Sequence, residues 1–92
     1  MDEAIPLFEL ALTDLERTLG PAHHDTLISR NNLASAYAVM GRFDEAIPMY
    51  EQNLSDSERA LGESHPITKT FGEILIAAHE AANSSRAAPP AE

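Results

Sequence analysis

The segment Asp2-Glu3-Ala4-Ile5-Pro6 returns unchanged as Asp44-Glu45-Ala46-Ile47-Pro48, an offset of 42 residues. The two copies stay in register beyond these segments, and 14 of the 25 positions from 2 to 26 are identical to positions 44 to 68. Identity then thins toward the end of the second copy. Agreement over this length predicts an array of structural repeats whose last element is adapted to face solvent.

Both copies have the pattern of amphipathic helices. Apolar residues recur at steps of three and four, which is the period of a helix buried on one side. Acidic residues precede each apolar stripe and suit a helix N-terminus, and Gly20, Gly41 and Gly62 stand where helices would end. Pro6 and Pro48 fall in or just beyond a first turn, where a missing amide costs little. We therefore predict an all-α fold with helices over residues 2–19, 26–40, 44–61 and 67–82.

Length and composition limit the chain to one small domain. Of its 92 residues, 43% are hydrophobic and only 5% aromatic, so the core must be thin and built by close helix approach. We expect the helical domain to cover residues 1–83. Residues 84–92 combine small, polar and proline residues, which bury too little surface to offset ordering entropy, and are expected to form a disordered tail.

The charge balance argues against several partners. A formal net charge of −9 offers no attraction to nucleic acid or anionic lipid, because both need clustered Lys and Arg. The chain has no cysteine, and its first residues lack the basic and apolar stretch of a secretory signal. We expect a cytoplasmic protein with no membrane or nucleic-acid partner.

Leu33-Ala34-Ser35-Ala36-Tyr37, Gly41, Ala46 and the pair Tyr50 and Leu54 have the spacing of a tetratricopeptide repeat, which the sequence resembles. The period of 42, a Leu-Gly-x-x-His connector and Asn-Asn-Leu-Ala on a helix resemble the kinesin-light-chain type of repeat. The resemblance covers residues 2–83 and implies an antiparallel helix-hairpin solenoid, here a fragment of four helices. Arg30 stands where the signature favours Trp, and His79 replaces an aromatic residue, so the match is incomplete there.

The resemblance also implies a concave groove for an extended peptide or a partner helix. Asn suits such a groove because its amide donates and accepts hydrogen bonds. The alternative is that the Asn pair is only a solvated face with a helix-packing hydrogen bond. The groove positions carried over from the family are Asn31, Asn32, Ser35, Thr70, Glu73 and Ala77.

The family's basic clamp for peptide carboxylates is not visible, which disfavours a ligand held by its terminal carboxylate. Ile28, Thr70, Glu73 and Ile74 stand where Lys or Arg would be needed. The nearby cation, Arg30, is expected to lie over Tyr37 or to pair with an acid.

In family terms the chain opens with an unpaired second helix of a hairpin and closes with an unpaired first helix. The helix over 2–19 keeps Leu7, Leu10 and Leu15, whereas the helix over 44–61 has polar residues at the positions equivalent to 10, 11 and 15 and is interpreted as the more solvated one. Because large apolar faces seldom stay bare, we expect the first helix to associate with a second copy as a homodimer, or with neighbouring repeats.

His23, His24, Asp25 and His65 could suggest a metal site. His23 and His65 are repeat equivalents, however, and should lie one repeat apart, so we expect connector histidines that hydrogen-bond backbone and no metal site. The sequence shows no phosphate loop, nucleophile elbow or His-Glu-x-x-His motif, so we predict no catalytic residues and no cofactor.

These observations favour a non-catalytic protein-interaction module that binds a partner peptide or helix in its groove. One alternative is an assembly element acting through helix 2–19. Another, by resemblance to bacterial repeats of this type, is a sensor-repeat fragment of a larger signalling protein.

Overall fold

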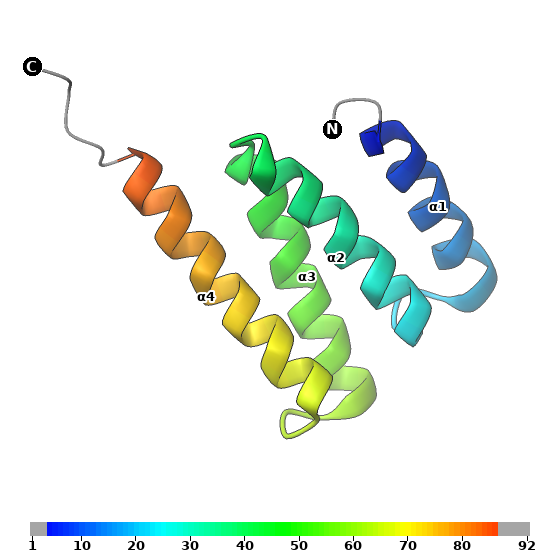
Figure 1. The fold of residues 1–92 in the computed structure, drawn as a ribbon. Helices are drawn as coiled ribbons and strands as arrows, with labels where there is room; N and C mark the ends of the chain where they lie inside the picture. The colour runs from blue at the N-terminus through cyan, green and yellow to red at the C-terminus, as the bar shows by residue number, and fades with distance from the viewer. Residues whose placement is uncertain (1–3, 87–92) are drawn as a thin grey trace, which may run out of the picture.

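The computed structural model describes residues 4–86, which form four helices and no strand. The helices are α1 (Ala4–Leu19), α2 (His24–Val39), α3 (Phe43–Leu61) and α4 (Pro66–Arg86). Each helix packs against the next one in the chain, and successive helices run in opposite directions (Figure 1). The predicted all-α fold of antiparallel helix hairpins is therefore confirmed.

Two connectors repeat the same local geometry. Gly20 and Gly62 each have φ of 92° and follow the last residue of α1 and α3. Their amides donate to Glu16 O and Glu58 O, which satisfies carbonyls left free at the helix ends. A positive φ of this size favours glycine, so the two glycines end their helices as predicted.

The predicted helix limits differ from the observed ones mainly at the C-terminal end. α2 starts two residues earlier than predicted, at His24, and α4 runs to Arg86 rather than ending at residue 82. α4 thus includes residues 84–86, which the sequence analysis placed in the tail. Residues 2–3 of the predicted first helix and 87–92 of the predicted tail lie outside the described residues.

A single core cluster runs through all four helices. Small residues let the helices approach closely, and the larger side chains fill the space between them. Its buried members are Ile5, Leu12, Leu33, Ala34, Ala36, Tyr37, Ala46, Tyr50 and Ala78.

Candidate interaction surfaces

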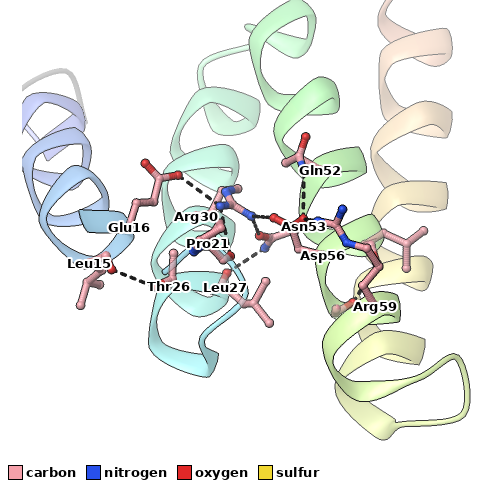
Figure 2. A network of polar contacts seen from close by, with 12 residues as sticks. Leu15, Glu16, Pro21, Thr26, Leu27, Arg30, Gln52, Asn53, Asp56 and Arg59 are labelled. Carbon is pink, nitrogen blue, oxygen red and sulfur yellow. Dashed lines mark hydrogen bonds and ion pairs between the residues drawn. The ribbon is translucent and has the colours of Figure 1, made fainter. Parts of the chain in front are cut away.

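Arg30 lies buried between three helices, where it holds α1, α2 and α3 together (Figure 2). Its Nη1 donates to Asn53 Oδ1 at 2.8 Å and to Asp56 Oδ2 at 2.9 Å, both on α3. Its Nη2 donates to Glu16 Oε2 on α1 at 3.1 Å and to the Pro21 carbonyl at 3.3 Å. A buried guanidinium is tolerated when its donors are hydrogen-bonded, and these four bonds provide acceptors for both Nη atoms of Arg30.

Asp56 is the acidic centre of this cluster. It is almost fully buried and also accepts hydrogen bonds from Gln52 Nε2 at 2.9 Å and from Arg59. Asn53, beside it, donates from Nδ2 to the Leu27 carbonyl on α2 at 2.7 Å. We refer to Arg30, Asn53 and Asp56 as the polar cluster. It fixes α3 against α2 and thereby sets the spacing of the surfaces described below.

Two interpretations of the sequence are corrected by the polar cluster. Arg30 does pair with acids as expected, but it does not lie over Tyr37, because Arg42 occupies that position with its guanidinium carbon 4.7 Å from the ring centroid. The second half of α3 is not the solvated surface expected, since Asn53 and Ser57 are buried. Asn53 donates to the Leu27 carbonyl on α2, and Ser57 donates to the Leu54 carbonyl within α3. A hydropathy comparison cannot distinguish buried, hydrogen-bonded polar residues from exposed ones.

An apolar cleft of about 330 Å³ lies between α2 and α4, with the start of α3 behind it. Its wall includes Val39, which is 70% exposed, and the Tyr50 hydroxyl is held there by a 2.9 Å hydrogen bond with Ser35 Oγ. Small side chains on α4 keep the cleft open. The lining residues are Ala38, Val39, Phe43, Tyr50, Ile74, Ala77, Ala78 and Ala81.

The predicted groove residues divide between two surfaces. Ala77 lines the cleft, and Ser35 reaches it through its bond to Tyr50. Asn32 instead lines a separate hollow between α1 and α2. Asn31 is half-buried one turn before Ser35, and its Oδ1 has no hydrogen-bond partner among residues 4–86. Thr70 and Glu73 are exposed on α4 and line neither surface.

The sequence analysis missed most of the apolar wall of the cleft. Val39 ends α2 and Phe43 begins α3, whereas Ala81 lies inside α4, and the repeat signature used above includes none of the three. The repeat itself could have linked two of these residues, because Ala81 stands 42 positions after Val39 and equivalent residues are expected on equivalent faces.

The hollow between α1 and α2 has a volume of about 530 Å³. Leu15, predicted to mediate self-association, lines it, whereas Leu7 and Leu10 are both 67% exposed on α1 outside its lining. Apolar side chains from α1 and polar side chains from α2 contribute to the hollow, which is lined by Phe8, Ala11, Leu15, His24, Asp25, Ile28, Ser29 and Asn32. α1 thus carries two neighbouring apolar surfaces.

A hydrogen bond between Tyr37 and Glu9 joins α2 to α1. Tyr37 Oη donates to Glu9 Oε2 at 2.6 Å. This hydrogen bond to Glu9, followed by burial, raises the pKa of Tyr37 above its ordinary value. The equivalent residues of the second copy repeat the contact, since His79 Nε2 lies 3.8 Å from Glu51 Oε2.

The connector histidines bond to backbone as predicted. His23 Nδ1 accepts a hydrogen bond from the Asp25 amide and His65 Nδ1 accepts one from the Ile67 amide, each at 3.1 Å. Each imidazole therefore satisfies an amide at the start of the following helix. Over residues 4–86, no group of three His, Asp or Glu side chains is arranged to hold a metal ion.

The repeat register, the helix hairpins and the cleft between alternate helices can now be compared with known proteins. The family model described as tetratricopeptide repeat matches residues 1–52, which is more than half of the chain. The chain is a tetratricopeptide repeat protein. Repeats of this family are typically non-catalytic modules for binding proteins.

This tetratricopeptide repeat protein is similar to Protein KINESIN LIGHT CHAIN-RELATED 2 of Arabidopsis thaliana, with 52% identity over 42 residues. The match covers 46% of the chain and 6% of that protein's length. The resemblance to kinesin-light-chain repeats is thereby confirmed. No solved structure matches the chain. In the described part of the chain, no helix is long and apolar enough to span a lipid bilayer.

Proposed function

We propose that this tetratricopeptide repeat protein binds an extended segment of a partner protein in the cleft between α2 and α4, without catalysing a reaction. The observation that carries the proposal is the cleft itself, whose 330 Å³ suits one apolar side chain of the partner. Val39 and Ala77 would contact that side chain, because Val39 is exposed and Ala77 leaves room beside it.

The charge near the cleft favours a partner that carries a cation next to the apolar residue. Glu73 is exposed one turn before Ala77 on α4, and the whole chain has a net charge of −9. A Lys or Arg in the partner would therefore be attracted to this side of the molecule.

The experiment is a selection of extended peptides from a random 12-residue display library, followed by fluorescence-polarisation titration of the selected peptides. Ala77→Arg should fill the cleft and reduce binding at least tenfold. Ile76→Arg is the matched control, because Ile76 neighbours Ala77 in the chain but does not line the cleft, and it should leave binding unchanged. Failure to select any peptide, or equal binding by both variants, would contradict the proposal.

Self-association through α1 is a second candidate, favoured by the exposure of Leu7 and Leu10 beside the hollow at Leu15. It predicts a homodimer or larger assembly whose thermal midpoint rises with protein concentration, because association then contributes to stability. Light scattering and thermal unfolding over a concentration series test it. A strict monomer at millimolar concentration would contradict it.

A further inference from the structure

α3 is covered on two faces by its two neighbours. The first face, which carries Ala46, Tyr50, Asn53 and Ser57, is buried, and the bonds from Asn53 to Leu27 and between Tyr50 and Ser35 show that α2 covers it. The second face packs on α4, where a Cβ atom on Gly72 would lie 3.9 Å from Leu54 Cδ1. α3 therefore has one covering helix before it and one after it.

α1, which is the repeat equivalent of α3, is covered on one face only. Ile5 and Leu12 are buried, and they match Ile47 and Leu54, which belong to the face that packs on the following helix. The residues that match the face under α2 are not buried, and three of them line the hollow. These residues are Ala4, Phe8, Ala11 and Leu15, and we refer to them as the open face of α1.

α4, the last of the four helices, also has an uncovered face. It is the repeat equivalent of α2, whose Ala34 is 0% exposed between its neighbours. The equivalent residue Ile76 is 60% exposed, and Lys69, the equivalent of the buried Leu27, is exposed as well. Over residues 4–86, no helix therefore covers this face of α4 as α3 covers α2.

We propose that α4 of a second copy covers the open face of α1, in the way that α2 covers α3, so that copies join head to tail. This inference rests on the self-association proposed above and names the surfaces that make it. The joined copies would continue the row of helices seen in Figure 1, with α4 of one copy and α1 of the next forming a helix pair.

Paired changes in polarity support α4 as the occupant. At the α2 and α3 contact, Arg30 donates to Asn53 and Ser35 shares a hydrogen bond with Tyr50. Both polar pairs become pairs without a polar side-chain atom in the joined copies, so neither helix would bury an unpaired donor or acceptor there. The equivalent pairs are Gly72 with Ala11 and Ala77 with Phe8.

Charge also matches across this contact. Asp14 on α1 is the equivalent of Asp56, which binds the cation of the polar cluster. α4 has no arginine at position 72, but Lys69 lies one turn earlier on the same helix. Lys69 of one copy would therefore pair with Asp14 of the next, and both side chains are exposed in the single copy.

Contacts of this kind use two different surfaces, so they do not close into a two-fold dimer. The test measures mass by light scattering for Ala11→Arg and Ile76→Arg, two substitutions at exposed positions. Wild type should grow beyond twice the chain mass as concentration rises. Each variant alone should remain monomeric, and their equimolar mixture should form a dimer and nothing larger, because only one intact pair of surfaces remains.

Two matched controls are Thr13→Arg on α1 and Thr70→Arg on α4, both at exposed positions. Their equivalents are Ser55 and Ile28, and the hydrogen bonds that join α2 to α3 come from other positions, so both variants should associate like wild type. Circular dichroism checks that every variant is helical. A charge exchange gives a second readout: Asp14→Lys and Lys69→Asp should each weaken association about tenfold, and the double variant should restore it.

The outcomes separate the two proposals. A monomeric wild type at all concentrations overturns both head-to-tail joining and self-association. If Ile76→Arg alone still forms a dimer while Ala11→Arg does not, self-association through α1 stands and head-to-tail joining is overturned. Neither result decides peptide capture in the cleft, which fluorescence polarisation measures separately.

Discussion

α1 and α3 share sequence but not surroundings. On α3, the face carrying Asn53, Asp56 and Ser57 is polar and completely covered by α2. On α1, the same face carries Ala11, Asp14 and Leu15, and it is open. The comparison teaches that residue polarity in this repeat does not report exposure. Residue polarity on this face instead matches the helix that covers it. On α3 that helix is α2 with its buried Arg30, and on α1 it would be the apolar face of α4 from a second copy.

The largest effect in this comparison is expected from Arg30→Met. The substitution leaves Asp56 buried with only Gln52 and Arg59 as side-chain partners, and loss of one partner of a buried ion pair costs about 3–5 kcal/mol. Urea unfolding measures the change in free energy. Arg17→Met is the control, because Arg17 pairs with Asp14 at the surface and should change stability by less than about 1 kcal/mol. Equal effects would remove the polar cluster from the account.

A smaller effect is expected from exchanging residues between the two faces. Ser57→Leu forces a large side chain into a fully buried position and should destabilise by about 1–3 kcal/mol. The reciprocal change, Leu15→Ser, falls on the open face and should cost less in dilute protein. Thermal unfolding at low concentration compares them, and a larger loss from Leu15→Ser would contradict the proposed difference between the faces.

The connectors should respond alike because their geometry is the same. Gly20→Ala and Gly62→Ala each force alanine to φ of 92°, at a cost of about 1–2 kcal/mol. Nothing lies within 4 Å of either position where a Cβ would go, so backbone strain is the cause. Chemical denaturation of the two variants measures the costs, and a difference above about 1 kcal/mol would mean that α1 and α3 end differently in solution.

The smallest effect concerns Tyr37, whose contact with Glu9 has a counterpart in His79 and Glu51. The pKa of Tyr37 is raised by Glu9 and by burial, so the folded protein holds the phenol proton more tightly than the unfolded chain does. Its contribution is complete below about pH 10 and is lost as pH rises through the raised pKa. Denaturant midpoints from pH 8 to 11 should fall for wild type and fall less for Tyr37→Phe; parallel curves would contradict this.

The sequence predicts the fold well because the repeat appears twice. The apolar stripes, Gly20, Gly62 and the connector histidines recur at the same offset, and the structure gives equivalent residues equivalent roles. The position of Arg30 was not predictable in the same way. Its partners Asn53 and Asp56 lie on a later helix and are recognisable only once α2 covers α3.

The predicted groove residues lie on different surfaces, and their role in binding stays a prediction. Ala77 lines the cleft and Ser35 bonds to Tyr50 of its wall, but Asn32 lines the hollow beside α1. Asn31 lies one turn before Ser35, and a shift of one position, to Asn32, changes the surface that the side chain reaches, since each residue turns the direction by about 100°. The repeat signature does not specify which way a side chain points at a helix end, so it could not predict that Val39 lines the cleft.

The central claim is that α1 and α4 each lack a covering helix which a second copy supplies. Amide hydrogen exchange measured at low and high protein concentration tests it most directly, because exchange reports the stability of each helix separately. The account predicts that protection rises with concentration in α1 and α4 while α2 and α3 change little. Protection that is independent of concentration in all four helices, or that rises in α1 alone, would contradict it.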